Sequence, residues 1–295
     1  MKVVLFCGGL GTRLREYSET IPKPLINIGY RPILWYIMKY YAYYGHNEFI
    51  LCLGYRSDLI KEYFLNYNEC DSNDFVLSDG GHRIHLFNTD IKDWKITFVD
   101  TGIQSNLGER LKAVEKYLDE DDVFLANYSD GLTDASLHHY LDHFYRNNSV
   151  ACFLCVKPSQ SFHAATVNDR GLVTGFRDVK YSDYRINGGF FVFKREIFDY
   201  MNEGEELVEQ PFQRLIAEQK LAAYKYDGFW AAIDTFKDKY RIDEMYSRGY
   251  KPWEVWNSNN LEFRRLDENT RTTIDKSARV INEEGILLMN EAIIQ

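Results

Sequence analysis

The sequence predicts an α/β protein built on a doubly wound, mostly parallel, Rossmann-like sheet. Short apolar runs at residues 2–6 and 49–53 alternate with amphipathic segments at residues 32–44 and 60–67. This β–α–β–α order is typical of parallel sheets that carry helices on both faces. The first apolar run leads directly into a glycine-rich loop that begins at Gly8. Because ligands of such sheets bind at the carboxyl ends of the strands, we expect the functional site at this loop.

A helix is expected over residues 32–44. Apolar side chains recur there at helical spacing (Ile33, Leu34, Ile37, Met38 and Tyr41). Pro32 suits the first turn of this helix, and Gly45 ends it. Residues 69–94 then interrupt the alternation, because a turn signal at residues 78–81 separates two short apolar runs. This pattern predicts an inserted β-hairpin.

The remaining elements continue the α/β pattern. Strands are expected at residues 95–99, 123–126, 151–156, 163–167, 172–178, 186–193 and 221–226, and helices at residues 108–118, 136–145, 195–201, 212–219 and 236–248. The pattern changes at about Asn257. We therefore expect one domain over residues 1–256 and a C-terminal extension, residues 257–295, to which the sequence assigns no function.

Composition excludes several classes of function. The formal charge of −9 gives no broad basic surface for nucleic acid, and no apolar run reaches the roughly 18 residues of a membrane span. Five cysteines, an odd number, with no signal peptide indicate a reducing compartment, the cytoplasm. The 22 tyrosines and 19 phenylalanines suggest wide apolar contacts, which would suit a homo-oligomer.

Two apparent metal motifs are interpreted as ordinary structure. Cys152 and Cys155 have the spacing of a redox or zinc pair, but they lie within a buried-strand pattern and no second pair exists. His139 and His143 are one helical turn apart, but the glutamate of a zinc-protease helix is replaced by Tyr140. We expect a core strand and a surface helix face.

The glycine-rich loop is suited to phosphate, and it is neither of the two commonest nucleotide loops. No lysine follows Gly11, so it is no Walker loop, and Leu14 stands where a dinucleotide fingerprint has its third glycine. Glycine lets backbone N–H groups approach phosphate oxygens, and Arg13 adds a forked cation. The sequence therefore predicts a phosphate-binding loop of another kind.

Polar residues follow several other strands. Asp130, at the end of the strand at 123–126 and before Gly131, is placed like a Mg²⁺ ligand, although an Asp-Gly turn is the alternative. A second aspartate, Asp234, follows at the end of the loop after the strand at 221–226. Arg110, one turn into a helix, could receive an anion or be solvated. Asn187 beside two glycines could hold a sugar hydroxyl or mark a β-bulge.

These motifs occur in a recognisable order: Gly8-Gly9-Leu10-Gly11-Thr12-Arg13-Leu14, Lys23-Pro24, Ser129-Asp130-Gly131, Asn187-Gly188-Gly189 and Ile233-Asp234-Thr235. The chain resembles the sugar-phosphate nucleotidylyltransferases over roughly residues 1–256. Further stretches, among them 32–39, 99–102, 110–112, 186–192 and 228–230, resemble the cytidylyl branch that acts on glucose 1-phosphate. The resemblance implies the fold of the nucleotide-diphospho-sugar transferases.

The resemblance also implies the reaction: CTP and a sugar 1-phosphate give a CDP-sugar and pyrophosphate by in-line attack on the α-phosphate. It implies these roles: triphosphate binding by Gly8, Gly9, Leu10, Gly11, Thr12 and Arg13; charge neutralisation by Lys23; Mg²⁺ binding by Asp130 and Asp234; contacts to the nucleotide by Ser105, Arg110 and Ser129; sugar contacts by Asn187, Gly188 and Glu209. Arg13, Lys23 and Asp130 would carry the catalysis.

The chain departs from the family at three points. Ser129 replaces a usual glycine, and Cys7 replaces a usual alanine. The usual Glu-Lys-Pro before the Asn-Gly-Gly motif is absent, which leaves Arg177 or Lys180 to replace its lysine and leaves the acceptor sugar open. Two alternatives therefore stand beside cytidylyl transfer: a uridylyl- or thymidylyltransferase on the same fold, and a catalytically silent nucleotide-binding subunit.

Overall fold

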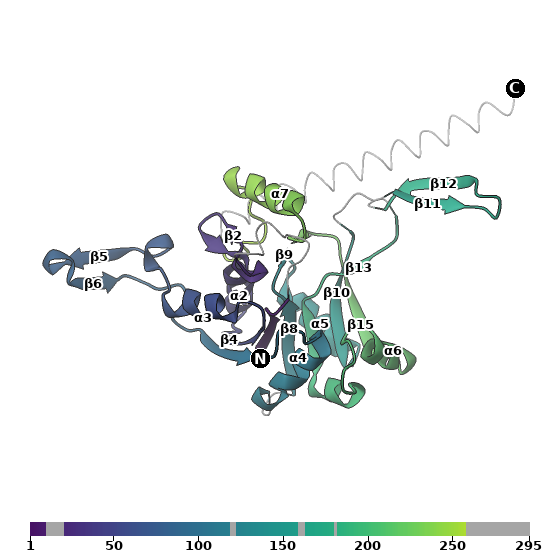
Figure 1. Cartoon of the computed structure of the whole chain (residues 1–295), viewed down its shortest axis with the longest axis horizontal. Helices are drawn as coiled ribbons and strands as arrows, with labels where there is room; N and C mark the ends of the chain where they lie inside the picture. Colours follow the sequence, from purple (N-terminus) through teal and green to yellow (C-terminus); the bar gives the residue numbers. More distant parts are fainter. Residues whose placement is uncertain (10–20, 119–121, 159–162, 180–181, 258–295) are drawn as a thin grey trace, which may run out of the picture.

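The structure is a computed structural model that describes residues 1–9, 21–118, 122–158, 163–179 and 182–257 (Figure 1). Its strands are β1 (Val3–Phe6), β2 (Asn27–Ile28), β3 (Arg31–Pro32), β4 (Glu48–Leu53), β5 (Phe75–Ser78), β6 (Arg83–Leu86), β7 (Lys95–Asp100), β8 (Val123–Tyr128), β9 (Gly131–Thr133), β10 (Ala151–Val156), β11 (His163–Val167), β12 (Val173–Asp178), β13 (Ile186–Asn187), β14 (Phe191–Lys194), β15 (Leu221–Tyr226) and β16 (Trp230–Ala232). Its α-helices are α2 (Ile33–Tyr43), α3 (Ser57–Leu65), α4 (Leu107–Val114), α5 (Leu137–Arg146), α6 (Gln210–Ala217) and α7 (Phe236–Ser247).

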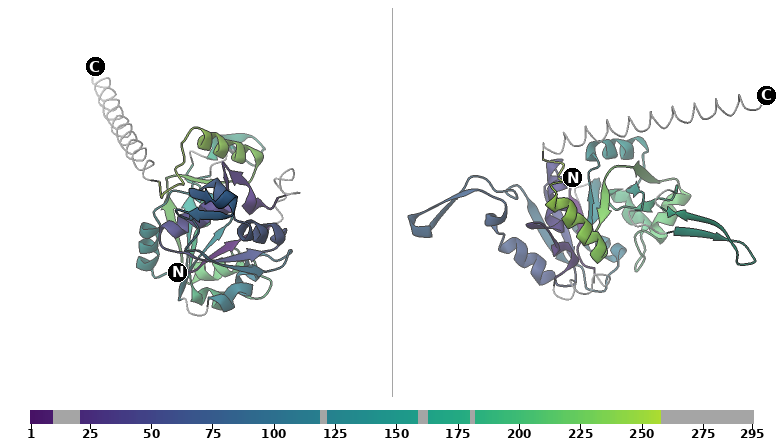
Figure 2. Two further views of the ribbon diagram at one scale, coloured as in Figure 1. Left: turned by 90° about the vertical axis from the view of Figure 1, so that its left-hand side faces the viewer. Right: turned by 90° about the horizontal axis from the view of Figure 1, so that it is seen from above.

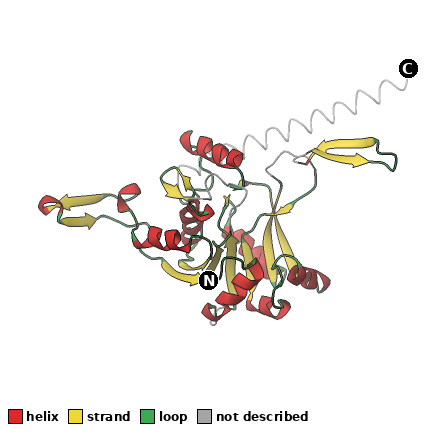
Figure 3. Cartoon of the chain, viewed as in Figure 1, coloured by secondary structure: helices red, strands yellow, loops and turns green. Residues whose placement is uncertain are grey.

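A single mixed sheet forms the centre of the molecule (Figure 3). Its strand order is β13-β10-β14-β8-β1-β4-β7, and β15 pairs with β10. The pairs β8–β1, β1–β4 and β4–β7 are parallel, as is β10–β15, whereas β14 runs antiparallel to its neighbours. The predicted α/β class with a mostly parallel sheet is therefore confirmed. Since β1 is central, Gly8 and Gly9, which follow it, lie in the middle of the carboxyl edge.

Each face of the sheet packs against its own layer of helices. Val3 and Leu5 of β1 belong to one apolar cluster together with side chains of α2 and α5. The alternate residues Val4 and Phe6 belong to a second cluster with side chains of α4 and α6. Because side chains alternate across a strand, a continuous apolar run such as β1 supplies both layers at once. This explains why the sheet is doubly wound.

Two hairpins extend away from the sheet on opposite sides of the molecule (Figures 1 and 2). One is the expected insertion, in which β5 and β6 pair antiparallel. The other pairs β11 with β12. Both carry exposed apolar side chains: Val76, Leu77 and Ile84 on the first, and Val173 and Phe176 on the second.

Three expected elements differ in detail. The segment at 186–193 is not one strand, because Gly189 and Phe190 have positive φ and turn the chain between β13 and β14. The helix expected at 195–201 is a 3₁₀-helix, Arg195–Tyr200. The helix expected at 108–118 ends as α4 at Val114 and continues as a 3₁₀ turn, Glu115–Tyr117.

The proposed extension, residues 257–295, lies outside the described residues apart from Asn257. Within the described ranges no helix is both long enough and apolar enough to cross a membrane.

Candidate active site

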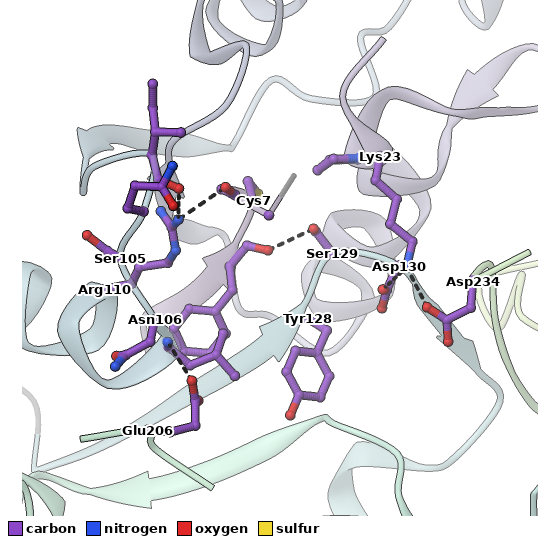
Figure 4. Close-up of a pocket in the computed structure, with 17 residues that line it drawn as sticks. Cys7, Lys23, Ser105, Asn106, Arg110, Tyr128, Ser129, Asp130, Glu206 and Asp234 are labelled. Carbon is purple, nitrogen blue, oxygen red and sulfur yellow. Dashed lines mark hydrogen bonds and ion pairs between the residues drawn. The ribbon is translucent and has the colours of Figure 1, made fainter. Parts of the chain in front are cut away.

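A cavity of about 470 Å³ opens at the carboxyl ends of β1 and β8 (Figure 4). This volume is in the range of sites that hold a nucleotide-sized ligand. The cavity is lined by Phe6, Cys7, Gly8, Gly9, Lys23, Pro24, Ile103, Gln104, Ser105, Asn106, Leu107, Arg110, Tyr128, Ser129, Asp130, Glu206 and Asp234. The described sequence-predicted residues of the loop, of the lysine motif and of the two aspartate motifs therefore share one cavity.

Lys23 and the two aspartates form its charged end. The ammonium nitrogen of Lys23 donates to Oδ2 of Asp130 at 2.5 Å and to Oδ1 of Asp234 at 2.7 Å. Asp130 follows β8, and Asp234 follows β16. The short strands β9 and β16 pair antiparallel, with Gly131 opposite Ala232, so that the two aspartates are brought side by side. Lys23 itself begins a 3₁₀ turn that is anchored by buried Pro24.

The charge of this end depends on all three groups. Burial lowers the pKa of Lys23, but the carboxylates of Asp130 and Asp234 outweigh burial and raise it above its ordinary value. The ammonium group is therefore charged at every physiological pH. One cation between two carboxylates leaves a net negative charge among these three side chains. The carboxylate oxygens converge, as they must to share a hard cation.

Arg110 ties together the loops at the other end of the cavity. It is 4% exposed. Its guanidinium donates to the Leu53 carbonyl at 3.2 Å, to the Thr101 hydroxyl at 2.7 Å, and to the carbonyls of Gly8 at 3.1 Å and Ile103 at 3.4 Å. These groups lie at or just after the carboxyl ends of β1, β4 and β7. The sequence left Arg110 as either solvated or an anion receptor; the structure shows a buried cation that lines the cavity and holds its loops.

Gly8 is required by this arrangement. A Cβ at Gly8 would lie 2.0 Å from Nη1 of Arg110, so any side chain would displace the guanidinium. The serines of the cavity also hold its wall. Ser129 Oγ donates to the Phe6 carbonyl at 2.8 Å, and Ser105 Oγ donates to the Thr101 carbonyl at 2.5 Å. Hydrogen bonds to neighbouring backbone thus fix both hydroxyls in place.

The Asn-Gly-Gly motif lies outside the cavity lining and is connected to it by a hydrogen bond to Tyr128. Asn187 accepts from Gly189 N–H at 2.9 Å and donates to the Tyr128 hydroxyl at 3.3 Å. The Gly188 carbonyl accepts from the Trp230 indole N–H at 2.9 Å. A Cβ at Gly189 would lie 2.6 Å from Oδ1 of Asn127. Asn187 and Gly188 therefore do not line the cavity, but Asn187 orients the tyrosine that does.

Two other predicted residues lie elsewhere. Glu209 is exposed at the start of α6 and does not line the cavity, whereas Glu206, three residues earlier, does. Arg177, a candidate to replace the missing family lysine, is exposed on the hairpin strand β12. The predicted positions outside the described residues are Leu10, Gly11, Thr12, Arg13 and Lys180.

Sequence reasoning overlooked Tyr128 and Glu206. Tyr128 directly precedes Ser129 and Asp130. The expected strand at 123–126 was two residues too short, and a strand that reached Tyr128 would have placed this side chain at the carboxyl edge of the sheet. Burial raises the pKa of Tyr128, and the charges of Asp130 and Glu206 raise it further, so its hydroxyl stays protonated. No local pattern marks Glu206, because it lies in a loop and reaches the cavity only through the packing of that loop on α4.

The chain belongs to the nucleotidyl transferase family, whose model matches residues 2–248. Within it, the chain is similar to glucose-1-phosphate cytidylyltransferases, as the sequence motifs implied. It is 40% identical to the protein named "probable glucose-1-phosphate cytidylyltransferase" of Bacillus subtilis (strain 168) and 36% identical to the glucose-1-phosphate cytidylyltransferase of Salmonella typhimurium. Each match spans 258 residues, 87% of this chain and 100% of the relative.

A solved structure supports the fold. UDP-glucose pyrophosphorylase in complex with UDP-glucose superimposes with a TM-score of 0.61, covering 84% of this chain and 98% of that one. The sequence identity is 12%, so this likeness concerns the fold alone. The predicted fold class and the resemblance stated from the motifs are both confirmed.

Proposed function

We propose that this protein is a cytidylyltransferase that joins CTP to a sugar 1-phosphate, giving a CDP-sugar and pyrophosphate. The observation that carries the proposal is the convergence of Lys23, Asp130 and Asp234 at one end of a nucleotide-sized cavity. The similarity to two cytidylyltransferases over their full length supports the choice of nucleotide and makes glucose 1-phosphate the first acceptor to test.

The reaction needs positioning and charge neutralisation more than covalent help. An oxygen of the sugar phosphate attacks the α-phosphorus of CTP, the bond to the β-phosphate oxygen breaks, and pyrophosphate leaves with that bonding pair. Lys23, charged at all relevant pH values, would neutralise charge growing on the α-phosphate and on the leaving group. Gly8 and Gly9 would present backbone to the triphosphate, as would Leu10, Gly11, Thr12 and Arg13, which the structure does not describe.

Asp130 and Asp234 fit a magnesium site. Their oxygens converge on one position, at 2.5 and 2.7 Å from the Lys23 nitrogen. Among the described residues, no group of three or more His, Cys, Asp or Glu side chains gathers as a metal cage. Two carboxylates, with substrate phosphates completing the shell, are the usual arrangement for Mg²⁺. When bound there, the ion would neutralise phosphate charge.

The acceptor would bind near Tyr128 and the Asn187 motif. Asn187 occupies one lone pair of the Tyr128 hydroxyl, which leaves its proton available to a sugar or phosphate oxygen at the cavity wall. Glu209, expected from the family pattern to contact the sugar, would do so only if the acceptor reached beyond the cavity. The alternatives of uridylyl or thymidylyl transfer use the same machinery and are separated by the assay below.

We also expect a cytoplasmic homo-oligomer. The apolar side chains exposed on the two hairpins, among them Leu77 and Phe176, would be covered by contact between copies. All five cysteines lie in the described residues and are free, which fits a reducing compartment. Light scattering of the purified chain would give its oligomeric state.

The decisive experiment incubates the protein with Mg²⁺, one of CTP, UTP or dTTP, and a panel of sugar 1-phosphates. Mass spectrometry of the products and pyrophosphate release report turnover. We expect CDP-glucose or another CDP-sugar. Exclusive use of UTP or dTTP would contradict cytidylyl transfer, and binding of CTP without turnover of any sugar phosphate would indicate a silent subunit.

A further inference from the structure

One half-buried carboxylate in the cavity wall, that of Glu206, is held only loosely by its backbone partners. Glu206 accepts from the Leu107 N–H through Oε2 at 3.4 Å, a long hydrogen bond. Its Oε1 is shielded from solvent and has no hydrogen-bond partner in the part of the chain that the structure describes. Burial raises the pKa of this carboxyl; the backbone N–H groups of Leu107 and Leu207 oppose the shift, and the nearby charges of Glu209 and Glu109 add to it. Because Oε1 is closed to a ligand in the cavity, a ligand that brings a hydrogen-bond donor would meet Oε2, whose hydrogen bond from Leu107 N–H is long.

Glu206 lies at the end of the cavity opposite to the charged end. In Figure 4, Lys23, Asp130 and Asp234 gather on one side, whereas Glu206 and Asn106 lie on the other, with Tyr128 between. A nucleotide whose phosphates lie beside Lys23 must extend its base toward the opposite end. The group that meets Glu206 is then an edge of the base.

The bases that the proposed function leaves open differ at the atom a carboxylate can sense. Cytosine carries an amino group at C4, which donates, whereas uracil and thymine carry an oxygen there, which accepts. A carboxylate accepts from the amino group and repels the oxygen. Glu206 already accepts one N–H, from Leu107, and retains capacity for another.

We propose that Glu206 determines the base specificity of this enzyme by accepting a hydrogen bond from the 4-amino group of CTP. The inference rests on the proposed cytidylyl transfer. A base with an oxygen at C4, such as uracil or thymine, has no donor there and would face the carboxylate with a second acceptor. A site built around one such hydrogen bond discriminates by about 10- to 100-fold.

Glu206→Gln tests the assignment. Glutamine keeps an acceptor for Leu107 N–H and adds an amide donor suited to the 4-oxo group, so the wall is preserved while its preference changes. We expect the ratio of kcat/KM for CTP over UTP to fall at least about tenfold. Glu203→Gln is the matched control: Glu203 is exposed in the same loop, outside the cavity, and loses the same charge. Its ratio should match that of the wild type.

A change to the substrate checks the same contact without changing the protein. The triphosphate of 2-pyrimidinone riboside lacks the 4-amino group, so the wild type should use it about 10- to 100-fold less well than CTP, and Glu206→Gln should show a smaller loss. An unchanged CTP-to-UTP ratio in Glu206→Gln, or an effect confined to the KM of the sugar phosphate, would overturn the inference. Preference of the wild type for UTP or dTTP would instead overturn the proposed function.

Discussion

The ammonium nitrogen of Lys23 lies 2.5 Å from a carboxylate oxygen of Asp130. The same nitrogen lies 2.7 Å from Asp234. One cation thus occupies the point on which both proposed metal ligands converge. The proposed reaction needs that cation at a phosphate and those carboxylates at a metal ion, so the three groups must rearrange when substrates bind.

Removal of either charge should suppress turnover while the fold is retained. We expect Lys23→Ala or Asp130→Asn to lower kcat by at least about a hundredfold, since each removes a charge directed at the transition state. Steady-state kinetics with CTP and the best acceptor measure the loss. The exposed Lys116→Ala should have a near-normal rate. Near-normal rates in either site variant would refute the site assignment.

Lys23 should compete with a divalent cation in the free protein. Lys23→Met removes the competing ammonium group, so we expect Mn²⁺ to bind about tenfold more tightly in the absence of nucleotide, although turnover is lost. Titration calorimetry or electron paramagnetic resonance measures the affinity directly. Lys116→Met should leave it unchanged. Weaker Mn²⁺ binding in Lys23→Met would show that the lysine does not block the carboxylates.

Arg110 should contribute to stability as well as to the site. Arg110→Met keeps the aliphatic stem but takes the guanidinium donor away from the Gly8 carbonyl and the Thr101 hydroxyl. We expect the free energy of unfolding to fall by about 2–4 kcal/mol. Urea denaturation followed by circular dichroism measures this change. Lys112→Met, exposed on the same helix, should change it by no more than about 0.5 kcal/mol.

Two glycines with nearly the same φ allow backbone strain to be measured apart from steric clash. Gly189 has φ +76° and Gly171 has φ +77°. A Cβ at Gly189 would lie 2.6 Å from Asn127 Oδ1, whereas a Cβ at Gly171 would meet nothing within 4 Å. Gly171→Ala should therefore cost about 1–2 kcal/mol through φ alone.

Gly189→Ala adds the clash to the same backbone cost. We expect its free energy of unfolding to fall by at least about 1 kcal/mol more than that of Gly171→Ala, because Asn127 is buried and cannot move away freely. The KM for the sugar phosphate should also rise, since Tyr128 depends on the adjacent Asn187. Equal costs for the two substitutions would show that the turn adapts.

Thiol reactivity should distinguish the cysteines. Burial raises the pKa of the Cys7 thiol to about 12, and this residue is 1% exposed. Only the thiolate reacts with iodoacetamide, so at pH 8 Cys7 should remain unmodified although it lines the cavity. Cys70 is exposed and should react first. Peptide mass mapping over time reports the order, and early modification of Cys7 would show that the cavity floor opens.

Local patterns were sufficient for most elements of the fold. The apolar run of β1, the helical spacing in α2 and the turn signal of the β5–β6 hairpin depend on nearest neighbours along the chain. Each was predicted within a few residues of its observed bounds. The turn at Gly189 was misjudged as part of a strand, because the positive φ that breaks it is imposed by contact with Asn127, far away in the sequence.

The sequence by itself determined the class of sheet, the glycine loop after β1, and the membership of Lys23, Asp130 and Asp234 in one set of motifs. Only the tertiary structure decided which oxygens meet, because the pairing of β9 with β16 brings two distant aspartates together. It likewise decided that Arg110 is buried and hydrogen-bonded to the loops around it, and that Glu206, not Glu209, lines the cavity. Such relationships arise from the packing of loops from different strands, and no spacing along the chain encodes them.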